Sequence, residues 1–443
     1  MQDEQYNMLS YKGNNNLKSQ KKKAYIFFSK HNISSIKYIF VICFIIVFNS
    51  HIDYIEINNE ISLYEKNKDY SNCETEIKAI ALYLPQFHSI KENDKWWGRG
   101  FTEWYNVRKA KPLYSGHHQP RIPGDNLNYL EYYDLSDMES IKKQINLAKT
   151  HGIYGFGIYY YWFSGKEILG KPLNILIKNI DIKFRFLIIW ANENWTRRWD
   201  GKDNEILLKQ EYKQDDPKNF IKDIKKYIID KRYIKIDQKP VLGLYEPNKI
   251  PKLTKTIKIW RKKSREIGIG EVFILICINQ NKTGDFEKLN LFDASYEFPP
   301  RNLNNMRRIL KKKTYIYSEI LLKSKDFNET NINFTKFPFF RGSMVEWDNC
   351  PRTVTCGIFD HYSPEKFYLF NKNIIDWTIK HYNKDLRFIF INAWNEWGEG
   401  TYLEPDDKYG YASINSLSKA IFNISYSEQC TTIGFDRIAV LIK

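Results

Sequence analysis

Two carboxylates stand three residues apart near the C-terminus, where an apolar run ends abruptly. Residues 388–393 are followed by Trp394 and Glu396, and then by Trp397 and Glu399. One carboxyl group of such a pair can protonate a glycosidic oxygen while the other stabilises, attacks or activates on the opposite side. Burial beside indoles can raise the pKa of the acid into the range that proton transfer requires. The spacing predicts Glu396 and Glu399 as a catalytic pair for glycosidic bonds.

Two glycines flank the second acid. Gly398 and Gly400 would let the backbone turn sharply, so that both carboxylates face one pocket. The alternative interpretation is that Glu396 alone lines the site and Glu399 caps a following helix.

Eight short apolar runs, rich in Ile, Phe and Tyr, have the composition of strands buried on both faces. They are residues 77–84, 155–162, 184–190, 241–245, 272–278, 294–296, 337–345 and 387–393. Helical patterns lie between many of them, opening at Ser136, at Asp216 and after Ser363, and covering 252–267 and 411–422. The alternation predicts a (β/α)8 TIM barrel over residues 77–425. A doubly wound α/β fold is the alternative, but the first strand lacks the Gly-rich turn that such a fold would carry.

Polar and aromatic residues follow several of these strands, where the active site of a barrel forms. Acids, amides and aromatic rings together suit the hydroxyls and flat faces of sugars. The candidate substrate-binding residues are Tyr83, Gln86, Trp97, Glu103, Trp104, Tyr161, Trp190, Asn192, Glu193, Trp195, Arg197, Trp347, Asp348, Trp394, Asn395, Trp397 and Tyr402. For any one of them a structural role in a loop, a cap or the core stays open.

Composition excludes other classes of protein. The net charge is +16, but the lysines are spread along helix-like segments and no zinc-finger or RNA-binding signature is present, so no nucleic acid is expected. The six cysteines form no C-x-x-C pair or metal spacing, so neither a metal nor a cofactor is expected. Cys277 reads as a buried thiol, and Cys350 and Cys356 could bridge in an oxidising compartment. The sequence does not indicate an oligomeric state.

The N-terminal region differs in kind from the rest. Residues 1–34 are polar and basic, and residues 36–50 are hydrophobic but shorter than the ~20 residues that span a bilayer comfortably. The segment has three interpretations: a short signal anchor, a cleaved signal, or a buried or interfacial helix. An anchor would make the protein membrane-associated, with its bulk on the far side of the membrane, and cleavage would make it secreted or periplasmic. Residues 51–76 read as a linker and 426–443 as a tail.

The motif at 395–401, with Glu404 and Pro405 after it, resembles the hallmark of family 99 glycoside hydrolases, the endo-α-mannosidases. The wider chain resembles the WbsX-type proteins of polysaccharide biosynthesis loci, through segments 83–88, 97–104, 190–195 and 347–352. The resemblance implies a (β/α)8 barrel and a retaining reaction on α-mannoside-like linkages. It also implies that Glu396 deprotonates the sugar 2-hydroxyl, which attacks the anomeric carbon to give an anhydro-sugar. Glu399 would act as general acid and then as base.

Three functions therefore compete. The first is a glycosidase or transglycosidase that uses Glu396 and Glu399 on an oligo- or polysaccharide. The second is a glycosyltransferase; the sequence has no Asp-x-Asp motif for a metal, but Arg197, Arg198 and Lys202 could hold a phosphate. The third is a glycan-binding protein with an idle site, which would not require both glutamates.

Overall fold

The computed structural model describes residues 64–124, 129–197, 202–278, 290–300, 313–325, 338–353 and 356–425. All of them belong to the second of two compact units, Ser62–Lys443. The predicted basic region 1–34, the hydrophobic segment 36–50 and the tail 426–443 lie outside the described residues. Within the described ranges, no helix combines the length and the apolar character needed to cross a membrane.

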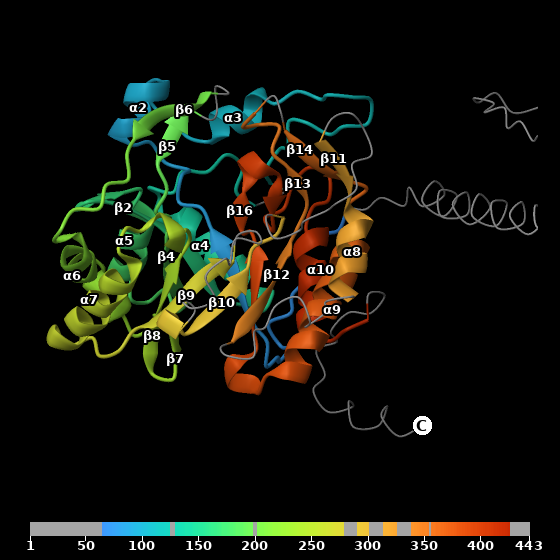
Figure 1. Ribbon diagram of the computed structural model, residues 1–443. Helices are drawn as coiled ribbons and strands as arrows, with labels where there is room; N and C mark the ends of the chain where they lie inside the picture. The colour runs from blue at the N-terminus through green and yellow to red at the C-terminus, as the bar shows by residue number, and fades with distance from the viewer. Residues whose placement is uncertain are drawn as a thin grey trace, which may run out of the picture. The chain divides into compact units, whose positions relative to one another are not determined.

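Eight parallel strands close into a barrel (Figure 1). They are β1 (Lys78–Tyr83), β2 (Ile153–Phe163), β4 (Arg185–Trp190), β8 (Lys239–Leu244), β9 (Phe273–Ile278), β10 (Ala294–Glu297), β12 (Phe339–Met344) and β15 (Phe388–Asn392). Each pairs in parallel with the next, and β15 pairs with β1 to close the ring. The predicted (β/α)8 barrel is confirmed, and the doubly wound alternative is wrong because such a sheet would keep two open edges.

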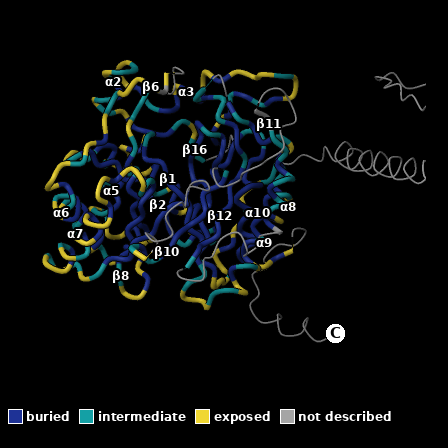
Figure 2. The backbone as a smooth tube through the Cα atoms, viewed as in Figure 1, coloured by how far each residue is buried: buried dark blue, intermediate teal, exposed yellow. Residues whose placement is uncertain are grey.

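The strands are buried on both faces, which explains why they read as nearly continuous apolar runs. Every residue of β9 and of β15 is buried. Figure 2 shows the barrel strands as buried, while exposed positions gather on outer helices such as α6 (Asp216–Ile228) and α7 (Leu253–Glu266). Inside the barrel, aromatic rings fill the space, for example Tyr296 stacked on Phe390. The barrel is therefore a packed core that supports whatever lies at its ends.

Most of the large helices lie where the sequence predicts them. Besides α6 and α7, these are α4 (Met138–Thr150), α9 (Pro364–His381) and α10 (Ala412–Ile421). Helices α5 (Lys171–Lys178) and α8 (Tyr317–Lys325) were not predicted. Ser363 caps α9 as expected, accepting from the Lys366 N–H. The cap of α4 is Asp137 and not Ser136, because the Asp137 carboxylate accepts from the N–H groups of both Glu139 and Ser140.

Several short helices and strands outside the eight-stranded barrel, called excursions here, gather at one end of the barrel, at the top of the view in Figure 1. They are α2 (Lys91–Trp97), α3 (Trp104–Lys109), the hairpin β5 (Trp195–Arg197) with β6 (Lys202–Leu208), the sheet of β11 (Lys313–Ile316), β13 (Trp347–Asp348) and β14 (Gly357–Asp360), and the hairpin β16 (Asn395–Glu396) with β17 (Thr401–Tyr402). Two short strands extend β2 and β8 in antiparallel fashion, β3 (Lys166–Ile168) and β7 (Lys235–Ile236). The excursions that follow β1, β4, β12 and β15 form the end where the site lies.

Part of the predicted linker is folded. Glu65 forms a parallel bridge with Gly410, and the buried ring of Tyr70 stacks on Phe422 with centroids 5.9 Å apart. The barrel unit therefore takes in residues before 77, because Tyr70 fills space beside the end of α10.

Candidate active site

A cavity of about 370 Å³ opens at the carboxyl end of the strands. Its walls are largely aromatic, formed by Trp96, Trp97, Tyr159, Tyr161, Trp195, Tyr245 and Phe298. Both predicted catalytic residues, Glu396 and Glu399, line it together with Arg352. Acids and ring faces thus meet in one hollow of the kind that binds small polar ligands.

One guanidinium joins three carboxylates in this cavity. Arg352 Nη2 lies 2.7 Å from Glu396 Oε2, and Nη1 lies 2.6 Å from Glu399 Oε1. The other edge of the fork binds Glu103, with Nη2 2.8 Å from Oε2 and Nε against Oε1. Glu103 is fully buried and Arg352 nearly so. The site therefore holds three carboxyl groups against one permanent positive charge.

This environment changes the acidity of Glu396. Burial raises the pKa of its carboxyl group from 4.5 to about 8; Arg352 opposes the rise, and the charges of Glu399 and Glu103 add to it. A carboxyl group with a pKa near neutrality can exchange a proton with a substrate at ordinary pH. The surroundings of Glu396 thus suit proton transfer.

The loop that carries the two acids is held from several sides. β16 pairs with β17, which sets Glu396 opposite Thr401. The Asn395 side chain accepts from the Leu84 N–H at 2.8 Å and donates to the Leu84 carbonyl at 3.0 Å. Residue 395 therefore ties the acid loop to the end of β1.

The two glycines of this loop have different roles. Gly400 has φ +64°, so it makes the sharp turn that the sequence predicts. Gly398 does not adopt a positive φ; instead, a Cβ there would collide with the Glu103 carboxylate and lie 2.7 Å from Arg352 Nε. Gly398 is needed for the close approach of the Arg352–Glu103 pair rather than for a turn.

The structure brings five of the predicted substrate-binding residues to the cavity: Gln86, Trp97, Tyr161, Glu193 and Trp195. Gln86 Nε2 donates to the Tyr161 hydroxyl at 3.3 Å, and Trp195 meets the same ring edge-on. Glu193 contacts Lys249 at 2.7 Å. Their substrate-binding role remains a prediction.

The other predicted residues do not line the cavity: Tyr83, Glu103, Trp104, Trp190, Asn192, Arg197, Trp347, Asp348, Trp394, Asn395, Trp397 and Tyr402. Most of them are buried and use their polar atoms inside the fold. The Trp104 N–H donates to the Tyr133 carbonyl, and the Trp190 N–H to the Trp162 carbonyl. Asn192 Nδ2 donates to the Glu246 carbonyl at 2.8 Å.

Two further members of this group show the same use of polar atoms. The Tyr83 hydroxyl donates to Gln144, and the Tyr402 hydroxyl to Asp406. Arg197, by contrast, is a more exposed residue that contacts Glu205 and lies over the Trp97 ring. Glu103 reaches the site only through Arg352.

The candidate list lacked several cavity residues. Arg352, Tyr159, Tyr245 and Asn349 line the cavity but were not among the candidates. Tyr245 directly follows β8, so the rule that strand ends form the site could have included it. Tyr159 lies inside β2, before the strand ends at Phe163. Arg352 ends segment 347–352, which carries the family resemblance, but no local pattern marks it as a site residue; it reaches the acids from the segment after β13.

The described cysteines have separate roles. Cys350 and Cys356 form a disulfide, with Cα atoms 4.8 Å apart. Cys73 is also disulfide-bonded, and Cys277 is a buried thiol as predicted.

One group of described residues has the spacing of metal ligands: His117, Asp348 and Cys350. The sulfur of Cys350 is in the disulfide. His117 Nδ1 accepts from the Leu113 N–H, so in neutral imidazole Nε2 carries the hydrogen that is donated to Asp348 at 2.7 Å. The group therefore fits a structural hydrogen-bond network and not a metal.

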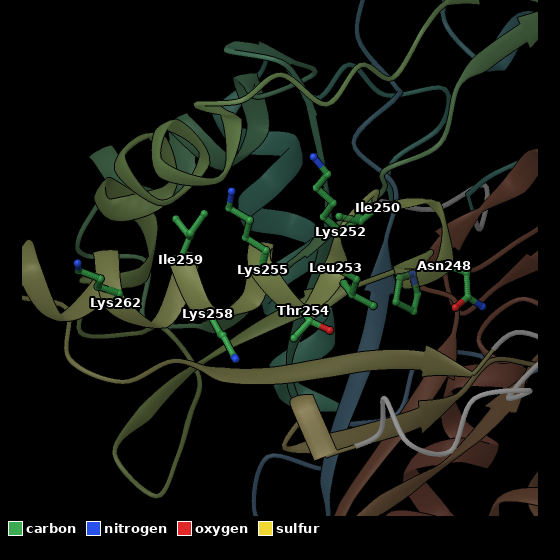
Figure 3. A pocket seen from close by; sticks show the side chains of 10 residues that line it. Asn248, Ile250, Lys252, Leu253, Thr254, Lys255, Lys258, Ile259 and Lys262 are labelled. Carbon is green, nitrogen blue, oxygen red and sulfur yellow. The ribbon is translucent and has the colours of Figure 1, made fainter.

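A second hollow, of about 730 Å³, lies along α7. Figure 3 shows its lining from Asn248 to Lys262, including four lysines of this segment: Lys252, Lys255, Lys258 and Lys262. No acid and no aromatic ring lines it, and none of the predicted site residues does. Although it is the larger hollow, it lacks the groups that act on a glycosidic bond.

Comparison with known proteins agrees with this barrel and its sequence motifs. The family model described as "Glycosyltransferase WbsX" matches residues 79–417. Proteins from two strains of Xanthomonas campestris pv. campestris, described as uncharacterized protein WxcX, are 35% identical over 348 residues, which is 77% of this chain and 49% of each relative. The chain thus spans about half the length of the curated relatives it matches.

A solved structure shows the same architecture. A glycoside hydrolase-like protein superposes with a TM-score of 0.51 at 13% identity, covering 82% of this chain and 97% of that protein. The GH99 endo-alpha-mannosidase from Bacteroides thetaiotaomicron gives a TM-score of 0.46 at 12% identity, covering 78% and 96%. The first likeness concerns the fold alone, and the second, with a TM-score below 0.5, carries no argument. Because the family model covers most of the chain, the protein belongs to the family described as glycosyltransferase WbsX.

Proposed function

We propose that this protein is an enzyme that acts on the glycosidic bonds of a glycan, with Glu396 and Glu399 as its catalytic pair. The observation that carries the proposal is that both carboxylates contact one guanidinium, that of Arg352, in a cavity walled by aromatic rings. Paired carboxyl groups are what a glycosidic bond requires, one for the leaving oxygen and one for the opposite side of the sugar.

The two acids receive different roles in this proposal. Glu396 takes the proton of the sugar 2-hydroxyl, which attacks the anomeric carbon while the glycosidic bond breaks. Glu399 gives its proton to the departing oxygen. In the second step the acceptor gives a proton to Glu399 and bonds to the anomeric carbon, the bond between that carbon and the 2-oxygen breaks, and Glu396 returns its proton to the 2-oxygen. The raised pKa of Glu396 supports its role, because a weaker acid has a more basic conjugate carboxylate.

The acceptor is either water or a second sugar. The family description favours transfer, and the charges of the cavity favour a glycoside as donor. Among the residues that line it, the cations Arg352 and Lys249 both already contact carboxylates. The diphosphate group of a nucleotide sugar would therefore meet the acids of the cavity, Glu193, Glu396 and Glu399, without a free cation among the described lining residues to bind. We therefore place transglycosylation beside hydrolysis, and a transferase that uses a nucleotide sugar as the second candidate.

An oxidising compartment is also proposed for this unit. The Cys350–Cys356 disulfide supports it, because disulfides persist in secreted and periplasmic proteins and are rare in the cytosol. The hydrophobic segment 36–50 would direct the chain there. Thiol labelling of the protein in intact cells tests this placement: protection of both cysteines until reduction supports it, and labelling of both without reductant contradicts it.

The test of function uses the full chain with a panel of α-mannosides and other glycans, with and without nucleotide sugars. New products without a nucleotide sugar are expected, and they should disappear in Glu399→Gln. Glu205→Gln is the matched control, because Glu205 is an exposed acid that contacts Arg197 outside the cavity lining. Products formed only with a nucleotide sugar would replace the main proposal with the second candidate.

A further inference from the structure

We infer that Arg352 is the positioning residue of the acid pair and that the Cys350–Cys356 disulfide holds it in place. The inference rests on the proposed function of Glu396 and Glu399 and adds a residue that lies outside the motif at 395–401. Arg352 is a positioning residue because it orients the two carboxylates and is not assigned any contact with the reacting atoms.

The first argument is geometric. The planar fork of Arg352 contacts Glu396 and Glu399 through different terminal nitrogens, at 2.7 and 2.6 Å. Its remaining edge is fixed by Glu103, whose carboxylate accepts from both Nε and Nη2. A bidentate pair fixes the plane of a guanidinium, so Glu103 sets the direction in which Arg352 presents its other N–H groups.

The second argument is electrostatic. The groups that face Glu396 are Arg352, Glu399, Glu103 and the hydroxyls of Tyr159 and Tyr161. Arg352 is the one cation among these groups, and an arginine stays charged in proteins. Without it, three carboxyl groups would share a buried space, and ionising Glu396 would become harder.

The third argument concerns what holds Arg352. Its N–H donates to the Asn349 carbonyl at 3.0 Å, and Asn349 Oδ1 accepts from the Gly357 N–H at 2.7 Å. The disulfide joins Cys350, just after β13, to Cys356, just before β14. The bond therefore ties together the two antiparallel strands from which Arg352 extends. A short tie of this kind limits how far Arg352 can move away from the acids.

The fourth argument is the fit of the acid loop. A Cβ at Gly398 would lie against the Arg352–Glu103 pair, and a Cβ at Gly400 would lie 2.7 Å from the Asp348 carbonyl oxygen. Both glycines thus admit the segment from Asp348 to Arg352 at close range. The acid loop and this segment are shaped for one another at two points.

The experiment measures the titration of Glu396 in several backgrounds. The melting temperature is recorded against pH for each protein and for its Glu396→Gln partner, and their difference gives the midpoint of Glu396. We expect Arg352→Met to raise this midpoint by about 1–3 pH units, the usual effect of a nearby opposite charge. Arg352→Lys should keep the midpoint nearer to that of the parent, because it keeps the charge.

Turnover supplies the second readout. Arg352→Lys should lower kcat at least about tenfold with a much smaller change in KM, because a point charge cannot replace the planar fork. Cys350→Ser with Cys356→Ser should lower kcat in the same way and raise the midpoint less than Arg352→Met does. Arg121→Lys is the matched control, since Arg121 is a buried arginine that contacts two acids, Glu346 and Asp406, away from the cavity lining.

An unchanged midpoint in Arg352→Met, or an unchanged kcat in Arg352→Lys, would overturn the role of Arg352. If Arg352→Met does not fold, Arg352→Lys still decides the question through kcat. An unchanged double serine variant would overturn the role of the disulfide. The midpoint is measured without substrate, so a protein inactive on every glycan would contradict the proposed function and leave this inference separately testable.

Discussion

Two buried carboxyl groups lie eight residues apart in the same C-terminal segment, and their surroundings are opposite in kind. Glu404 accepts from four neutral donors: Tyr129 at 3.0 Å, Tyr133 and Gln144 at 2.8 Å and the Trp397 indole at 2.7 Å. Glu396 shares one arginine with two other acids at the edge of a cavity.

The difference separates structure from chemistry. The hydrogen bonds to Glu404 come from segment 129–133, from Gln144 on α4 and from Trp397 of the acid loop, so this carboxyl group ties the acid loop to the rest of the fold. Glu396 has few donors and several like charges, so its carboxyl group keeps its proton to a higher pH than an ordinary glutamate does. It also lines the cavity where a ligand would bind. Burial alone does not indicate that an acid is functional. A buried acid in a cavity is a candidate when neighbouring charges also shift its pKa.

The largest expected effect is on turnover. Glu399→Gln should reduce kcat by about 10²–10⁴-fold, the usual contribution of a general acid or base, while glycan binding persists. Binding is measured by calorimetry and turnover by product analysis, with Glu205→Gln as the exposed control. Turnover equal to that of the parent would remove Glu399 from the mechanism.

The second effect is on stability, and here Glu404 is expected to matter more than Glu396. Glu404→Gln should lower the free energy of unfolding by about 2 kcal/mol, because an amide accepts the four hydrogen bonds more weakly and brings N–H donors among other donors. Glu396→Gln should abolish activity without such a loss. Urea unfolding measures both variants. The comparison fails if Glu396→Gln is the destabilised variant and Glu404→Gln keeps the stability of the parent.

The third effect is a pH dependence of stability. Because the pKa of Glu396 is about 8 in the folded protein, the folded state binds more protons than the unfolded state between pH 4.5 and about 8. The stability contributed by protonated Glu396 is therefore lost as pH rises through this window. The melting temperature of Glu396→Gln should exceed that of the parent by a margin that grows from pH 4.5 to 8. A margin that is constant with pH would contradict the raised pKa.

The smallest effect concerns the tryptophans. Trp195 lines the cavity, so Trp195→Ala should raise KM by roughly tenfold, the value of one lost ring contact, with little loss of stability. Trp397 is buried against Tyr402 with centroids 3.7 Å apart, so Trp397→Ala should instead destabilise the fold. Steady-state kinetics and thermal unfolding distinguish the two. An unchanged KM in Trp195→Ala would show that the Trp195 side of the cavity does not bind the glycan.

The barrel could be predicted because its strands carry their own signal. A strand buried on both faces must be apolar throughout, and β9 and β15 read that way in the sequence. The hairpin of β5 and β6 is short and more polar, so its existence depends on the loop geometry that the barrel provides. The predicted start of α4 was wrong by one residue. Ser136 and Asp137 are adjacent residues that can both cap a helix, and the structure uses Asp137.

The site was less predictable than the barrel. The pair Glu396 and Glu399 lies within one short motif, so its spacing is local. Glu103 and Arg352 are 249 residues apart, and only the closed barrel brings them together. Local sequence also does not predict the direction in which a tryptophan side chain points. Trp195 faces the cavity while Trp397 fills the core, although both are tryptophans beside polar residues.

The most direct test is a crystal structure of Glu399→Gln soaked with an oligosaccharide that the parent protein processes. The account predicts sugar rings against the aromatic walls near Trp195, a glycosidic oxygen within hydrogen-bond distance of residue 399, and a 2-hydroxyl beside Glu396. A sugar bound in the hollow along α7, or in the cavity with its glycosidic oxygen remote from both residues, would contradict it.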